Sequence, residues 1–138
     1  MARTFGIIGV GNMGGAILKG IVTRGAIEAQ HVVVYDRNPA AVERAKELGA
    51  RSAERVEELV QASDMVMLGV KPKDAISALQ SAGRLLEGKA LLSIVAGVSY
   101  KDLQEALPDV NFRILTVLPN TPIMVGEGAT GFTLETTF

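Results

Sequence analysis

Cysteine is absent from this 138-residue chain and histidine occurs only once, as His31. Without cysteine the chain has no disulfide framework and no thiolate metal site, and a reducing compartment suits it. A single histidine makes a transition-metal site improbable and removes any Ser-His-Asp triad. His31 precedes an expected strand, and we expect it to be structural or exposed. These absences exclude secreted disulfide scaffolds, thiolate zinc modules and triad hydrolases.

An excess of one charge is also lacking, because 14 basic residues face 15 acidic ones and the net charge is -1. No uniform positive field exists to collect nucleic acid or an anionic membrane, so any phosphate site must be local. No apolar run approaches the length of a membrane span, and residues 1–4 lead straight into a short strand without a signal sequence. We therefore expect a cytoplasmic protein without membrane or nucleic-acid partners.

The length fits one domain over residues 1–138 and is too short for a two-domain dehydrogenase. Apolar runs typical of buried strands alternate with segments of helical periodicity. Strands are expected at 5–8, 32–35, 50–53, 65–70, 90–95 and 112–118, with short β segments around Gly126 and Gly128. Helices are expected at 13–24, from Asn38-Pro39 to Gly49, around 56–60, along a stripe from Ile76 to Leu86, and from Ser99 through Leu107. This order predicts an α/β fold: a doubly wound, mostly parallel Rossmann sheet with helices on both faces.

The first strand ends in the turn Gly9-Val10-Gly11-Asn12-Met13-Gly14, which opens a helix. In such a turn Gly9 permits the tight bend, Gly11 lets the backbone approach a pyrophosphate, and Gly14 lets helix and strand pack closely. The helix N-terminus then holds phosphates without a basic side chain. The alternative is a purely structural turn.

Asp36 follows the second strand, near the offset of about 20 residues at which a ribose-binding acid is expected. It would accept hydrogen bonds from the ribose hydroxyls of NAD and repel the 2′-phosphate of NADP, whereas Arg37 could pair with that phosphate. Either residue could instead be a solvated loop charge. The cofactor is therefore NADP or NAD, and these residues leave the choice open.

Two further pairs, Lys71-Pro72 and Ala96-Gly97, follow central strands at the edge where doubly wound sheets bind ligands, and we expect them to line the nicotinamide half. Lys71 as a catalytic acid would need a lowered pKa, and a phosphate or structural role competes with that reading. Asn120, between two prolines, could bond a carboxamide or a substrate, or simply form the turn.

Together these segments, with Ser93-Ile94-Val95-Ala96-Gly97-Val98 and Leu118-Pro119-Asn120-Thr121-Pro122, resemble the N-terminal domain of pyrroline-5-carboxylate reductase. The resemblance implies the last step of proline synthesis, in which hydride from NADPH or NADH reduces the C=N bond of 1-pyrroline-5-carboxylate to L-proline. It also implies which residues contact the cofactor: Gly9, Val10, Gly11, Asn12, Met13, Gly14, Asp36, Arg37, Asn38, Gly69, Val70, Lys71, Pro72, Ala96 and Gly97, with Asn120, Thr121 and Pro122 beside the nicotinamide.

The chain departs from that family at Thr116, where arginine is usual, and at Leu118, where methionine is common. A relative with another imine or small-acid substrate therefore stays open. Asp36 also replaces the small hydroxyl residues of NADPH-preferring members. Family members carry a second, helical domain that forms a homo-oligomer and supplies most of the substrate pocket. Alone, the chain is expected to bind cofactor without turnover, and no catalytic residue is assigned. The alternatives are a β-hydroxyacid dehydrogenase relative and a stand-alone, non-catalytic dinucleotide-binding module.

Overall fold

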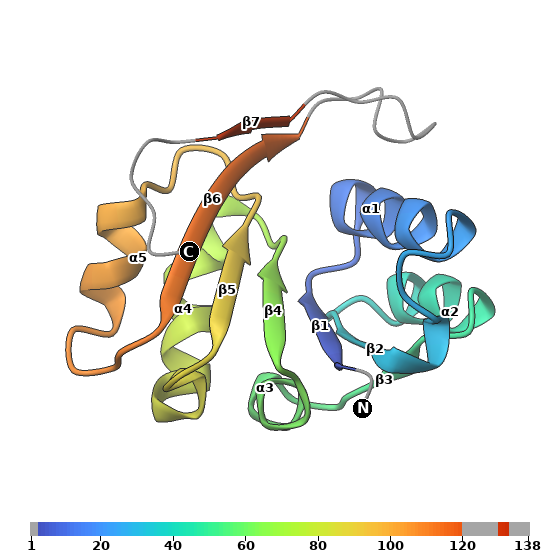
Figure 1. Cartoon of the computed structure of the whole chain (residues 1–138), viewed down its shortest axis with the longest axis horizontal. Coiled ribbons are helices and arrows are strands. Elements are labelled where there is room, and N and C mark those ends of the chain that lie inside the picture. The colour runs from blue at the N-terminus through green and yellow to red at the C-terminus, as the bar shows by residue number, and fades with distance from the viewer. Residues whose placement is uncertain (1–2, 120–129, 133–138) are drawn as a thin grey trace.

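The computed structural model describes residues 3–119 and 130–132, in which strands and helices alternate (Figure 1). In chain order the elements are β1 (Phe5–Ile8), α1 (Asn12–Thr23), a 3₁₀ turn (Ala29–His31), β2 (Val32–Tyr35), α2 (Pro39–Glu47), β3 (Arg51–Ser52), α3 (Val56–Ala62), β4 (Met65–Leu68), α4 (Pro72–Ala82), a second 3₁₀ turn (Gly83–Leu86), β5 (Ala90–Ser93), α5 (Tyr100–Ala106), β6 (Arg113–Pro119) and β7 (Thr130–Phe132).

The strands form one sheet in the order β3-β2-β1-β4-β5-β6-β7. All neighbours are parallel except β6 and β7, which are antiparallel. The chain winds outward from β1 in one direction, then returns to place β4 on the other side of β1. The predicted doubly wound, mostly parallel Rossmann sheet is therefore confirmed, and the order reverses between β1 and β4. In such sheets ligands bind outside the carboxyl ends of the strands at that point.

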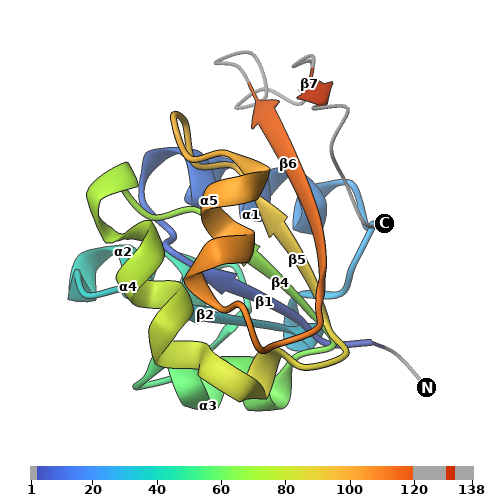
Figure 2. The same cartoon turned by 90° about the vertical axis from the view of Figure 1, so that its left-hand side faces the viewer.

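Helices lie on both faces of the sheet, as expected, but they cover the faces unequally. Helices α3, α4 and α5 lie on one face (Figure 2). Their side chains Leu59, Leu79 and Leu103 are fully buried in one core. On the other face, α1 and α2 bury Leu18 and Ala45 against β1 and β2. The buried residues of α2 are alanines, whose small side chains let this helix approach the strands closely.

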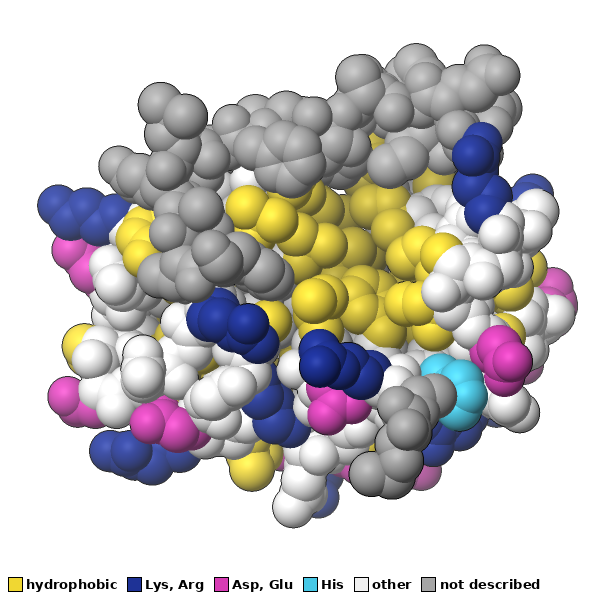
Figure 3. All heavy atoms as spheres, viewed as in Figure 1, with side chains coloured by type: hydrophobic (Ala, Val, Ile, Leu, Met, Phe, Trp, Pro, Cys, Tyr) yellow, Lys and Arg dark blue, Asp and Glu magenta, His cyan; other side chains and the backbone are white. Residues whose placement is uncertain are grey.

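Among the described residues, no helix covers the second face over β4, β5 and β6. Strand side chains alternate between faces, so Val66 and Leu68 enter the first core while Met65 and Met67 point to the second face. There Met65, Leu92 and Leu115 stay half-buried. Figure 3 shows a broad apolar surface facing the viewer in this region.

The two predicted helix N-caps, Asn38 and Ser99, both form. The Asn38 side chain accepts a hydrogen bond from the Ala40 amide at 3.0 Å, as an N-cap does. Ser99 and Asp102 form the predicted capping box, each side chain bonded to the other residue's backbone N–H.

Several boundaries differ from prediction. Gly83 has φ +52° and ends α4, so the stripe to Leu86 continues as a 3₁₀ turn rather than as helix. The strands expected through residues 70 and 95 end at Leu68 and Ser93. The β segments expected around residues 126 and 128 lie outside the described residues. No helix in the described part of the chain is long and apolar enough to cross a bilayer.

Candidate functional site

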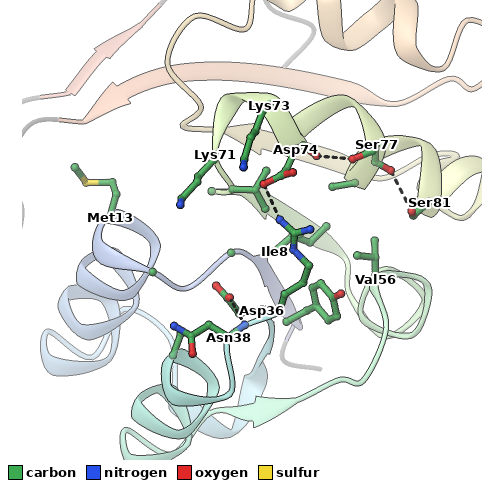
Figure 4. A pocket seen from close by; sticks show the side chains of 18 of the residues that line it. Ile8, Met13, Asp36, Asn38, Val56, Lys71, Lys73, Asp74, Ser77 and Ser81 are labelled. Carbon is green, nitrogen blue, oxygen red and sulfur yellow. Dashed lines mark hydrogen bonds and ion pairs between the residues drawn. The ribbon is translucent and has the colours of Figure 1, made fainter.

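A cleft of about 730 Å³ opens at the carboxyl ends of β1, β2 and β4 (Figure 4). Its walls are the start of α1, the loop that joins β2 to α2, and one side of α4 from Lys73 to Ser81. The strand register brings these walls together, because Ile8 at the end of β1 pairs with both Tyr35 and Leu68. The cleft therefore occupies the point of strand-order reversal.

Gly9 connects β1 to the helix in a conformation that side chains rarely adopt, with φ +97°. Its amide donates to the Tyr35 carbonyl at 2.8 Å. A Cβ here would stand only 2.7 Å from the backbone carbonyl of Gly69. Gly9 is thus required both by the turn and by the close approach of the chain leaving β4.

Gly14 lets α1 pack against the turn, since a Cβ on it would lie 2.0 Å from the Gly9 carbonyl oxygen. Gly11 differs, because no described atom lies within 4 Å of the position its Cβ would take. At the start of the helix, the Gly15 amide donates a hydrogen bond to the Gly11 carbonyl at 2.8 Å.

Among the described residues, no side chain caps the start of α1, and its first turn has no acidic residue. The amides of Asn12 and Met13 consequently have no partner within the helix. The positive end of the helix dipole adds to their attraction for an anion. The open space at Gly11 gives a diphosphate room to reach them.

Asp36 is fixed by two backbone amides. Its Oδ2 accepts from Val10 N at 2.9 Å, and its Oδ1 accepts from Asn38 N at 2.8 Å. The carboxylate therefore ties the glycine turn to the loop after β2. A carboxylate has about four acceptor sites, so each oxygen of Asp36 can also accept a ligand hydroxyl.

An ion pair spans the cleft from the β2–α2 loop to α4. The Arg37 guanidinium lies 2.8 Å from Oδ2 of Asp74, which belongs to the first turn of α4. The Arg37 side chain is 72% exposed and that of Asp74 only 23%. Asp74 is therefore the more buried partner of the two.

Comparison with known proteins agrees with this geometry. The family model described as NADP oxidoreductase, coenzyme F420-dependent, matches residues 4–97. The chain belongs to this family. The match includes the glycine turn, Asp36, Arg37 and the start of α4, and so covers every wall of the cleft.

The curated relatives of this chain include pyrroline-5-carboxylate reductases. Pyrroline-5-carboxylate reductase 3 of Macaca fascicularis is 34% identical, over 92% of this chain and 46% of the relative. The Escherichia coli (strain K12) enzyme is 35% identical, over 96% and 50%. The chain therefore spans about half the length of these relatives.

Solved structures agree. Plasmodium falciparum pyrroline carboxylate reductase with NADP bound has a TM-score of 0.85 at 29% identity, covering 98% of this chain and 48% of that one. The Coxiella burnetii enzyme has a TM-score of 0.88 at 25% identity, over 96% and 49%. These matches confirm the resemblance drawn from the sequence motifs.

The structure gathers a large share of the sequence-predicted residues around the cleft: Gly9, Gly11, Asn12, Met13, Asp36, Arg37, Asn38, Gly69, Val70 and Lys71. Val10 and Gly14 are the buried members of the glycine turn, and Pro72 is the exposed first residue of α4. None of these three lines the cleft.

Ala96 and Gly97 are exposed in the turn after β5 and do not line the cleft either. Asn120, Thr121 and Pro122 lie outside the described residues. Thr116, where the resemblance leads one to expect arginine, is buried within the sheet beside Ser93. His31 ends a 3₁₀ turn, with Nε2 3.5 Å from Glu28, at the opposite end of the strands from the cleft.

Sequence reasoning missed the α4 wall of the cleft, formed by Lys73, Asp74, Ser77, Ala78 and Ser81. The sequence did offer a signal for this wall. Because α4 begins at Pro72, directly after Lys71, the start of this helix must lie at the same edge of the sheet as Gly69. The partner of Arg37 had no such signal, because Asp74 is 37 residues away in sequence.

Proposed function

We propose that this chain binds NADH or NADPH with the pyrophosphate at the N-terminus of α1. The observation that carries the proposal is the open space at Gly11 in front of amides without helix partners. Asp36, fixed at the end of β2, is placed to accept ribose hydroxyls. Two relatives support the ligand class: the Plasmodium falciparum enzyme was solved with NADP and a Myxococcus stipitatus imine reductase with NAD+.

The nicotinamide end of the ligand would then extend from the pyrophosphate toward Gly69, Val70 and Lys71. The turn at Ala96 and Gly97 and the segment from Asn120 to Pro122 would complete this end, in keeping with the family resemblance. The bound cofactor would supply the hydride, and the chain's own residues would bind and orient it. We assign no proton donor.

For the full-length protein we propose reduction of 1-pyrroline-5-carboxylate to L-proline, as the named relatives suggest. The apolar face at Met65, Leu92 and Leu115 would be covered by the remaining half of the protein, because the relatives are about twice as long. That half would supply the substrate pocket and the homo-oligomer contact. We propose the cytoplasm as the compartment.

Titration of the chain with NADH and NADPH, followed by cofactor fluorescence, tests the binding proposal. Gly11→Val should abolish binding while the protein stays folded, because the branched side chain would occupy phosphate space. Gly20→Val is the matched control on the same helix, since a Cβ there also meets no described atom within 4 Å. Normal binding by Gly11→Val would refute the placement of the pyrophosphate.

Oxidation of the reduced cofactor in the presence of pyrroline-5-carboxylate tests the activity. We expect turnover by a chain extended to the length of the relatives and none by residues 1–138 alone. Binding without turnover in both proteins would instead identify a non-catalytic module. Turnover of a small hydroxy acid by the extended protein would identify a β-hydroxyacid dehydrogenase.

A further inference from the structure

The side chain that pairs with Arg37 comes from a different wall of the cleft. Arg37 follows Asp36 in the loop after β2, whereas Asp74 belongs to α4. Figure 4 shows Asp74 facing the loop that carries Asp36 and Asn38, while Lys71 extends toward Met13 on α1. The Arg37–Asp74 pair therefore lies at the end of the cleft where the proposed function places the adenosine ribose.

Two carboxylates and one guanidinium thus meet at this end. Asp36 is held by the amides of Val10 and Asn38, so its charge cannot move away from the ribose position. A 2′-phosphate needs a cation beside that charge, and Arg37 is the cation on the same loop. At 2.8 Å from Asp74, however, the guanidinium is already paired with a carboxylate that offsets part of its charge.

We propose that Asp74 is a positioning residue that sets the choice between NADH and NADPH by competing with the 2′-phosphate for Arg37. The inference rests on the proposed function and deepens it. To reach the 2′-phosphate of NADPH, Arg37 must weaken or give up its contact with the half-buried Asp74 carboxylate. NADH has a 2′-hydroxyl, which donates to Asp36 and leaves the ion pair intact.

The test is a double-mutant cycle on Arg37 and Asp74, with dissociation constants for both cofactors measured by fluorescence titration. Asp74→Asn should bind NADPH about fivefold more tightly, the scale of one partly exposed ion pair, with NADH affinity changed less than about twofold. Asp74→Glu, which keeps the charge, should restore the wild-type ratio. A merely structural role of Asp74 would change both affinities together.

Arg37→Ala separates release of the arginine from simple charge repulsion. The loss of NADPH affinity caused by Arg37→Ala should be about fivefold larger in the Asp74→Asn background than in the wild type. Equal costs in the two backgrounds, or an Asp74→Asn gain that persists without Arg37, would overturn the proposal. Failure of the wild-type chain to bind either cofactor would instead overturn the proposed function. Because exposed ion pairs contribute little to folding, all variants should fold.

Discussion

Replacing Gly14 with alanine is expected to destabilise the domain strongly. The added methyl would stand 2.0 Å from the Gly9 carbonyl oxygen and 3.1 Å from its carbonyl carbon. Both partners in this clash are held by backbone, so no side-chain rotation relieves it. Relief requires α1 to move away from the end of β1 by about 1 Å or more, since such contacts need 3 Å or more.

Overpacking of this kind costs about 1–3 kcal/mol, and a backbone clash belongs at the upper end, about 3 kcal/mol. For a domain of this size that corresponds to a melting temperature lower by about 10 °C. Thermal unfolding followed by far-ultraviolet circular dichroism measures the shift. A Gly14→Ala protein as stable as the wild type would refute the close-packing account of this glycine.

The same substitution at Gly20, later on α1, is the matched control and should have the opposite sign. No described atom lies within 4 Å of its would-be Cβ. Alanine is about 1 kcal/mol more favourable than glycine inside a helix. Gly20→Ala should therefore raise the melting temperature by about 2–5 °C.

Two further predictions concern residues outside the cleft. Lys89 donates to the carbonyl oxygens of Val60, Gln61 and Ser63 at the C-terminal end of α3, so Lys89→Met should lower the free energy of unfolding, measured with urea, by about 1–3 kcal/mol. Hydrogen bonds from the Ser99 backbone and side chain lower the pKa of Asp102 below 3.8 in the folded protein. Its stabilisation is therefore present above pH 3.8 and lost as the pH falls through the lower folded value, and Asp102→Asn should make the urea midpoint less dependent on pH in that range.

Much of the β1–α1 half of the site could be predicted because its determinants are local. Gly9 and Gly14 belong to one short turn, and the clash that requires Gly14 lies within that turn, whereas the close approach of Gly69 to Gly9 joins residues distant in sequence. The capping residues Asn38 and Ser99 were equally readable, since each bonds a backbone amide two or three residues away. Contacts between residues close in the chain can be predicted from short sequence motifs.

The parts that could not be predicted depend on contacts between distant residues. Asp36 looked like a ribose ligand, but nothing in the sequence indicated that it also accepts from the Val10 amide, 26 residues earlier. Met65, Leu92 and Leu115 looked like ordinary core residues, because periodicity reveals the side of a strand and not whether a helix covers it.

The two ends of the cleft therefore differ in what controls them. In the proposed binding mode, the diphosphate is held by backbone amides at the glycine turn, so substitutions on α4 should leave diphosphate binding intact. The proposed selection between 2′-hydroxyl and 2′-phosphate depends on side chains from separate elements, joined by a partly exposed ion pair whose energy is small. If so, substitution of Asp74 or Arg37 should shift the preference between NADH and NADPH without destabilising the fold that positions the pyrophosphate.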